Sequence, residues 1–273
     1  MFELSQDHED FRASVRDFAE REVEPHVAQW DKDHHLPLEV VQRMGDLGLF
    51  GLVVPERWGG SAETVDGVVQ SDFTALCVAI EELGRVDQSI GITLSAGVGL
   101  GINPILTYGT DEQRDRWLPD LVAGRALAGF GLTEPDAGSD PGGMKTRATK
   151  VDGGYVLKGA KMWITNSPIA DVAVVWAKTD EAIRGFIVER GMKGFSTPKI
   201  EGKVSLRASI TGEIVLDDVF VPADAMLPKA KGLSGPFGCL NRARYGIAWG
   251  AMGAAEDCWH RARQYTLDRK QFG

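Results

Sequence analysis

The sequence has few cysteines and no long apolar run, and each shortage excludes a class of protein. Its 273 residues include three cysteines, Cys77, Cys239 and Cys258, which stand far apart among apolar neighbours. This pattern predicts reduced, buried thiols in a cytoplasmic protein and argues against a disulfide framework or a cysteine zinc site. No run reaches the ~18 consecutive apolar residues of a membrane-spanning helix, so no membrane span is expected.

The sequence also lacks a net positive charge and several well-known catalytic motifs. The net charge of -9 makes nucleic acid an unfavourable partner. The five histidines form no chelating pair at helical spacing, so no metal site is expected. There is no Gly-x-Ser-x-Gly motif and no P-loop, which leaves α/β-hydrolase and P-loop chemistry unsupported. The glycines of 97–101 have the wrong spacing for a dinucleotide fingerprint and instead indicate close helix packing.

The hydrophobic pattern predicts an α+β chain with segregated domains. A helical period governs the first 120 residues, with Ser5 as an N-cap and a capping box at Thr110. From about Ala126 the pattern changes to short β-rich runs, and Asp152-Gly153-Gly154 indicates a hairpin turn. The expected helices cover 11–23, 39–47, 73–83, 89–108 with a break near Pro104, 110–118 and 237–268, and the expected strands cover 146–151, 155–157, 172–177, 185–188 and 213–221.

Two segments of the β-rich region carry more polar chemistry than a scaffold needs. In the first, 130–141, Gly138-Ser139 forms a tight turn that can present backbone N–H groups to an anion. In the second, 161–168, the indole of Trp163 can pack on a flat ring while the following hydroxyl and amide bond its heteroatoms. Each segment alone is equally explained as a capped loop. Together, ~30 residues apart in one β-region, they favour a planar polar cofactor.

These segments resemble the signatures of the acyl-CoA dehydrogenase family of FAD enzymes. The similar motifs are 131–140, 163–166 and the closing Arg-Lys-Gln-Phe-Gly of 269–273, and the resemblance extends over essentially the whole chain. It implies a helical N-terminal domain in 1–125, a β-domain in 126–232 and, in 233–273, the first helix of a C-terminal helical domain that the chain otherwise lacks.

The resemblance also assigns ligand-binding roles by position. Thr133 and Thr165 would bond the isoalloxazine edge, Trp163 would cover its face, and Ser139 would bond the CoA portion of the substrate. Arg269 and Gln271 would reach the FAD of a neighbouring subunit, which implies a homo-oligomer, usually a tetramer. The implied FAD residues are Phe130, Leu132, Thr133, Gly138, Ser139, Trp163, Ile164, Thr165, Arg269 and Gln271, and the implied CoA residues are Ser139, Asn241 and Arg244.

The implied reaction is α,β-dehydrogenation of an acyl-CoA, with electrons passed on to an electron-transfer flavoprotein. The family places its catalytic Glu either far into the C-terminal domain or one residue before the CoA-binding Arg. The second position is Ala243 here. No catalytic residue is therefore expected in this chain, which by itself should not turn over. A related oxidase or flavin monooxygenase and a non-catalytic FAD- or acyl-CoA-binding fragment remain alternatives.

Residues 203–209 and 235–250 most resemble glutaryl-CoA dehydrogenases, which catalyse an oxidative decarboxylation. That subgroup holds the distal carboxylate of its substrate with an Arg-Ser pair, whose positions are Gly91 and Ile92 here. A buried carboxylate without a cation is costly. The sequence therefore favours an uncharged acyl chain in a groove lined by Gly91 and Leu94, with the dicarboxylate as the alternative.

Overall fold

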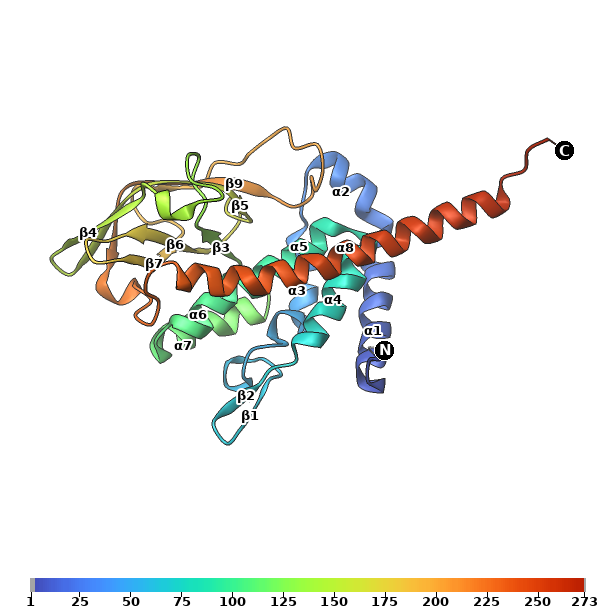
Figure 1. The fold of residues 1–273 in the computed structure, drawn as a ribbon, viewed down its shortest axis with the longest axis horizontal. Helices are drawn as coiled ribbons and strands as arrows, with labels where there is room; N and C mark the ends of the chain where they lie inside the picture. The colour runs from blue at the N-terminus through green and yellow to red at the C-terminus, as the bar shows by residue number, and fades with distance from the viewer. Residues whose placement is uncertain (1–2, 273) are drawn as a thin grey trace.

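The chain folds into a helical part and a β-sheet part, so the predicted α+β class is confirmed. The computed structural model describes residues 3–272, and Met1, Phe2 and Gly273, which the predicted domains and closing motif include, lie outside this range. Helices gather around the long α8, and the sheet packs beside one end of that helix (Figure 1). The α-helices are α1 (Gln6–Phe18), α2 (Val27–Asp33), α3 (Leu38–Asp46), α4 (Phe73–Val86), α5 (Gln88–Ala96), α6 (Asn103–Tyr108), α7 (Asp111–Val122) and α8 (Ser234–Asp268).

Local capping signals set several helix ends where the sequence predicts them. The Ser5 hydroxyl accepts the backbone N–H of His8 at the start of α1. Thr110 and Gln113 form a reciprocal capping box at the start of α7, which satisfies two otherwise free backbone donors. Gly48, with φ of 74°, follows the end of α3. These ends depend on neighbours in sequence, which is why they can be predicted.

The apolar stretch before α7 is interrupted at its glycines rather than at Pro104. A π-helical segment, Gly97–Ile102, joins α5 to α6, and Pro104 lies in the first turn of α6, where its missing N–H costs little. The continuous helix Gln88–Tyr108 is long and apolar enough to span a membrane by length and composition. However, 72% of its apolar window is buried in the fold, which is the burial of a core helix.

The sheet has seven strands in the order β3-β6-β4-β5-β9-β8, with β7 paired to β6. Asp152 and Gly153 connect β4 to β5 as predicted, and Gly153 has the positive φ, 73°, that the turn requires. The strand β5 continues to Thr165, well beyond the predicted end at 157. Bounds are β3 (Ala128–Gly131), β4 (Arg147–Val151), β5 (Gly154–Thr165), β6 (Val172–Lys178), β7 (Ile183–Glu189), β8 (Phe195–Ser196) and β9 (Thr211–Pro222).

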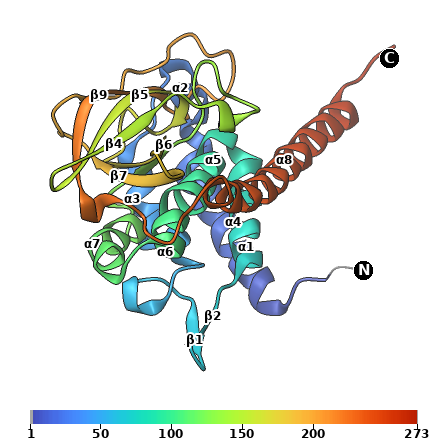
Figure 2. The same cartoon turned by 60° about the vertical axis from the view of Figure 1, so that its left-hand side comes forward.

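A small hairpin that the sequence analysis missed lies outside this sheet. Its strands β1 (Glu63–Val65) and β2 (Val68–Gln70) pair with each other only, and all their residues are exposed. The hairpin projects away from the helices (Figure 2). With three residues per strand and no buried face, it lacks the alternating apolar pattern by which strands are recognised.

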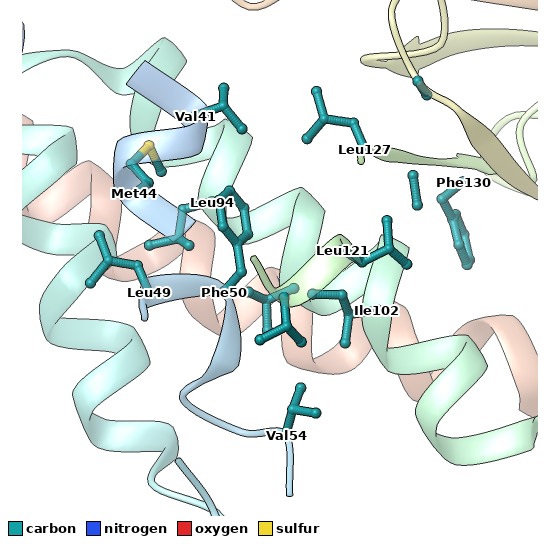
Figure 3. Packing of buried hydrophobic residues seen from close by; sticks show 14 of the residues in the cluster. Val41, Met44, Leu49, Phe50, Val54, Leu94, Ile102, Leu121, Leu127 and Phe130 are labelled. Carbon is teal, nitrogen blue, oxygen red and sulfur yellow. The ribbon is translucent and has the colours of Figure 1, made fainter. Parts of the chain in front are cut away.

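One hydrophobic core joins the helical part to the sheet. Buried side chains from α3, α5 and α7 pack toward Leu127 and Phe130, which enter the sheet with β3 (Figure 3). Met44, Leu94 and Ile102 are almost fully buried in this cluster. Because the two parts share a core, residues at their junction are held in fixed relative positions.

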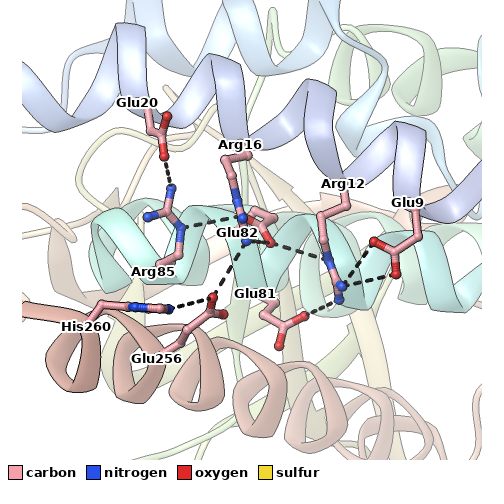
Figure 4. Close-up of polar contacts among 9 residues, drawn as sticks. All are labelled: Glu9, Arg12, Arg16, Glu20, Glu81, Glu82, Arg85, Glu256 and His260. Carbon is pink, nitrogen blue, oxygen red and sulfur yellow. Dashed lines mark hydrogen bonds and ion pairs between the residues drawn. The ribbon is translucent and has the colours of Figure 1, made fainter. Parts of the chain in front are cut away.

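An ion-pair network ties α1, α4 and α8 together (Figure 4). Its centre is Glu82, 1% exposed, whose carboxylate accepts hydrogen bonds from Arg16 Nε at 2.7 Å and Nη2 at 2.9 Å. Arg12 and Arg85 also lie within ion-pair distance of Glu82, and Glu256 of α8 lies 3.8 Å from Arg16. A buried carboxylate surrounded by guanidinium groups is compensated in place, so it fixes how these helices align.

The predicted burial of all three thiols is wrong at one position. Cys77 and Cys239 are buried, and burial raises the pKa of Cys77 to about 12 and that of Cys239 to about 11. Cys258, which lies on α8, is exposed. Apolar neighbours along the chain do not bury a helix that packs on one side only.

The contact between α8 and α4 allows no side chain at its tightest point. A Cβ on Gly253 would stand 2.0 Å from the carbonyl oxygen of Glu81 and 2.9 Å from the backbone nitrogen of Arg85. We expect Gly253→Ala to destabilise the protein by about 2 kcal/mol or more, as overpacking does, although alanine favours helix formation by about 1 kcal/mol. The measurement is the free energy of unfolding in urea, monitored by circular dichroism.

Ala255→Gly is the matched control for Gly253→Ala, because Ala255 is exposed on the same helix. It should cost about 1 kcal/mol from helix propensity alone. A Gly253→Ala protein as stable as wild type would show that the two helices separate at this point without loss.

Candidate functional site

The strongest candidate site is a cavity where the sheet meets α8. Its volume is about 230 Å³, below the ~300–1,000 Å³ of a complete small-molecule pocket, so it can hold only part of a large ligand such as a ring system. Nine of the residues predicted to bind FAD or CoA line it. The full lining is Ala96, Leu100, Ala128, Phe130, Leu132, Thr133, Gly138, Ser139, Pro141, Trp163, Ile164, Thr165, Phe237, Leu240 and Arg244.

A buried ion pair joins the two segments that form the cavity wall. Lys161 Nζ donates to Glu134 Oε1 at 2.8 Å and to the carbonyl oxygen of Leu132 at 3.1 Å. Lys161 is fully buried and Glu134 is 5% exposed. The backbone N–H of Met162 also donates to the carbonyl of Thr133 at 2.9 Å. The segment 131–139 is therefore fastened to β5 next to Trp163.

Glu134 is fully engaged as a structural carboxylate. Its second oxygen accepts the N–H of Lys145 at 2.6 Å, and Oε1 also accepts the N–H of Thr146 at 3.0 Å. Burial opposes ionisation, but hydrogen bonds from Lys161, Thr146 and Lys145 together hold the pKa of Glu134 below its ordinary value. Burial lowers the pKa of Lys161 to about 8 despite the attraction of Glu134. A carboxylate held this way is not available as a proton acceptor.

Trp163 is presented to the cavity by an unusual backbone. Both Trp163 and Asn166 have φ of 63°, a left-handed conformation that costs a non-glycine residue roughly 1–3 kcal/mol. The register between β5 and β9 shifts between Lys161 and Ile164, as at a β-bulge. As a result the indole is 55% exposed although it belongs to a central strand. An exposed indole held at such a cost is a surface for stacking.

The helix α8 supplies the opposite side of the cavity. Phe237, Leu240 and Arg244 line it at i, i+3 and i+7, one face of a helix. The Arg244 guanidinium donates to the Asn241 side-chain oxygen at 3.0 Å. Asn241 does not line the cavity itself but orients the arginine that does. Periodicity could have indicated Phe237 and Leu240 once Arg244 was assigned, whereas Ala96 and Leu100 depend on tertiary packing.

Four predicted ligand residues lie elsewhere. Gly91 is buried against Gly84 of α4, and Leu94 is fully buried in the core, so neither lines this cavity. Arg269 and Gln271 are exposed and follow the projecting end of α8. Their assigned roles stay predictions, and for Arg269 and Gln271 the role requires a second subunit.

Comparison with known proteins identifies the family. Residues 5–125 match the acyl-CoA dehydrogenase N-terminal domain, and residues 129–219 match the acyl-CoA dehydrogenase middle domain. The chain is 39% identical, over 100% of its length and 71% of the relative's, to the short-chain specific acyl-CoA dehydrogenase of Clostridium acetobutylicum. The chain therefore belongs to the acyl-CoA dehydrogenase family, whose members are oxidoreductases.

Solved structures give the same result. The glutaryl-CoA dehydrogenase of Mycobacterium smegmatis in complex with FADH2 has a TM-score of 0.93 and 43% identity, covering 98% of this chain and 67% of that one. A chain in the structure of the electron transferring flavoprotein of Acidaminococcus fermentans has a TM-score of 0.93 and 37% identity, covering 100% and 71%. This chain spans 64% to 72% of the length of the curated relatives it matches, which include mitochondrial isovaleryl-CoA dehydrogenases of Oryza sativa subsp. japonica and Arabidopsis thaliana.

The cavity fits FAD, the cofactor of this family. A flavin presents a flat apolar face and a polar edge. The Trp163 indole offers a matching exposed face, and the hydroxyls of Thr133, Ser139 and Thr165 line the same space. Gly138 leaves open space where a Cβ would stand, so the backbone there can approach a ligand closely.

The buried ion pair predicts a large stability effect from one lysine. Lys161→Met should destabilise the protein by about 3–5 kcal/mol, because it leaves the Glu134 carboxylate buried without its cation. The double variant Lys161→Met/Glu134→Gln should recover part of this loss, because the uncompensated charge is gone. Urea unfolding of the single and double variants measures both effects.

The pair Lys145–Asp136 is a matched control in the same segment, since its atoms are 2.6 Å apart but both side chains are more than 70% exposed. Lys145→Met should leave the stability close to that of wild type, because solvent-exposed ion pairs contribute little. Equal losses for Lys161→Met and Lys145→Met would contradict the structural role given to the buried pair.

Proposed function

We propose that this chain forms the FAD- and CoA-binding part of an acyl-CoA dehydrogenase that introduces an α,β double bond into an acyl thioester and passes its electrons to an electron-transfer flavoprotein. The observation that carries the proposal is a single cavity in which an exposed indole, three hydroxyls and one arginine converge at the junction of the sheet and α8. Membership of the acyl-CoA dehydrogenase family supports it.

The cavity residues would divide the work of binding. FAD supplies the hydride acceptor of this chemistry. Trp163 would cover the face of its ring, and the hydroxyls of Thr133 and Thr165 would bond the ring edge. Phe130, Leu132 and Ile164 are buried and would keep water from the reacting atoms. Gly138 and Ser139 would bring backbone and hydroxyl donors to the phosphate-bearing parts of the ligands.

The substrate we propose is a CoA ester with an uncharged acyl chain. Arg244 is the one charged residue of the cavity lining, and a guanidinium matches the phosphates of CoA by paired hydrogen bonds. Using it for CoA leaves no cation in the lining for a distal carboxylate. A dicarboxylate such as glutaryl-CoA would therefore be disfavoured, although a glutaryl-CoA dehydrogenase is among the similar structures.

None of the lining residues can remove the α-proton of the substrate. The lining contains no Asp or Glu, and the nearby Glu134 is held by Lys161. Ala243 lies on α8 between Arg242 and Arg244 with its Cβ facing Gly99. The residues described here would therefore bind and orient the reactants without supplying the base.

The proposal extends to partners and location. We propose a homo-oligomer, with a tetramer as the form expected for the family, because the resemblance assigns Arg269 and Gln271 to the FAD of a neighbouring subunit and both residues are exposed after the end of α8. The similarity to a chain in a structure of an electron transferring flavoprotein supports that class of protein as electron acceptor. We also propose a cytoplasmic location, since the three cysteines are free thiols.

The proposed function is tested by flavin absorption. The purified chain should take up FAD and show the visible band of oxidised flavin. Anaerobic addition of butyryl-CoA should leave that band unchanged in wild type and bleach it in Ala243→Glu, which places a carboxylate where some relatives carry their base. Glutaryl-CoA should bleach the flavin band of Ala243→Glu far more slowly than butyryl-CoA does.

Four results would contradict parts of this proposal. Failure to bind FAD would refute the cofactor assignment, and rapid bleaching of wild type would show a base that the cavity lining does not reveal. Bleaching of Ala243→Glu by glutaryl-CoA as fast as by butyryl-CoA would refute the uncharged substrate. Peroxide released in air during turnover would indicate an oxidase instead.

Arg244 gives a second prediction about CoA. Arg244→Gln should weaken binding of butyryl-CoA by roughly tenfold or more, since charge-assisted hydrogen bonds to phosphate contribute about 1.5–3 kcal/mol. Isothermal titration calorimetry on the FAD-loaded chain measures this. FAD affinity should stay unchanged. Arg242→Gln is the control, because Arg242 bonds Asn103 at 3.0 Å and does not line the cavity. Equal effects of both substitutions would contradict a specific CoA contact.

A further inference from the structure

We propose that Arg190 is a positioning residue for the flavin-binding wall, acting through the turn that follows Trp163–Thr165. Arg190 lies outside every motif identified in the sequence and does not line the cavity. It comes directly after β7 and reaches across to the segment 166–170, here called the 166–170 turn. The inference rests on the proposed function, because the proposed function assigns the cavity wall formed by Trp163–Thr165 to the flavin.

The Arg190 guanidinium holds this turn through two backbone oxygens. Its Nε donates to the carbonyl of Ala170 at 2.6 Å, and its Nη2 donates to the carbonyl of Ser167 at 2.9 Å. Its own backbone N–H donates to the carbonyl of Asp171 at 2.8 Å. The rigid planar fork of a guanidinium fixes the separation of the two acceptors, which the point charge of a lysine does not.

These two carbonyls depend on Arg190. Ser167 is 1% exposed and Ala170 is 4% exposed. Within residues 3–272, no other donor bonds either oxygen, and Arg190 forms no ion pair. Arg190 itself is exposed, so water can replace its guanidinium, but separate water molecules do not hold the two carbonyls at a fixed separation, and the turn would become free to open.

Opening the turn would release the strained residues that shape the wall. Trp163 and Asn166 both have a left-handed backbone conformation, and Ile164 and Thr165 lie between them in the sequence. Such conformations persist only where the surroundings determine them. The Asn166 N–H donates to the carbonyl of Ile210 at 2.7 Å at the start of the turn, and Arg190 holds its end. Arg190 thus keeps Trp163 and Thr165 in the arrangement that would receive a ring.

The test compares Arg190→Met with wild type in two measurements. In hydrogen exchange of the FAD-free chain, amides of residues 163–170 should exchange at least tenfold faster in the variant, while those of α4 stay unchanged. In FAD titration the dissociation constant should rise at least tenfold, and the visible spectrum of the bound flavin should shift. Arg190→Lys should give exchange rates and a dissociation constant between those of wild type and Arg190→Met, because a lysine can bond only one of the two carbonyls well.

The matched control is Arg116→Met, which removes a guanidinium that pairs with the neighbouring Glu189 at 2.8 Å and touches neither the turn nor the cavity. It should leave exchange at 163–170 and FAD affinity as in wild type. Unchanged exchange in Arg190→Met, or FAD affinity equal to wild type, would overturn the inference. Should Arg190→Met fail to fold, Arg190→Lys decides alone, and wild-type behaviour of that variant would overturn the inference. Lack of FAD binding by wild type would instead refute the proposed function and leave the exchange result to decide the role of Arg190.

Discussion

The ion pair between Glu134 and Lys161 is the constraint on which the cavity depends. Two charges so deeply buried are tolerable only when each is compensated nearby, and the carboxylate accepts two backbone N–H groups besides the ammonium. This requirement leaves little freedom in the segment 131–146, which has to stay against β5 for the charges to remain paired. Both walls of the cavity follow from that placement, since Thr133 and Ser139 lie on one joined segment and Trp163 and Thr165 on the other.

The remaining side of the cavity is supplied by α8, and its position depends on a different constraint. Where α8 contacts α4, glycines leave no side chain between the two helices. Gly253 of α8 and Gly84 of α4 allow the two helix backbones to lie against each other, so the position of the whole helix is set at a contact far from the cavity. The ion pairs around Glu82 fix the same helices from their polar side. A rigid helix carries that placement along its length to Leu240 and Arg244. The site therefore combines a polar anchor in the sheet with an apolar anchor among the helices.

The difference between what could and could not be predicted follows the range of each interaction. The capping box at Thr110 and the turn at Gly153 involve neighbours in sequence, and both are found where expected. By contrast, β5 was predicted to end at Leu157, where Lys158 and Gly159 interrupt the apolar run, yet the strand continues through the buried Lys161. Its burial makes sense only with Glu134, 27 residues earlier in the chain. Leu94 shows the same limit, since its place on an apolar helix does not reveal which neighbour buries it.

At Trp163 the observed backbone conformation differs from the one expected for a residue in a central strand, and this difference is informative. A central strand would normally bury a tryptophan, yet here the register shifts and the residue turns left-handed so that the indole faces outward. Neither the core nor the sheet gains from this, because the exposed ring packs less surface than a buried one. The cost is offset only if something else covers the indole. A ligand face does this, and so the local violation of folding rules points to the same place as the hydroxyls and Arg244.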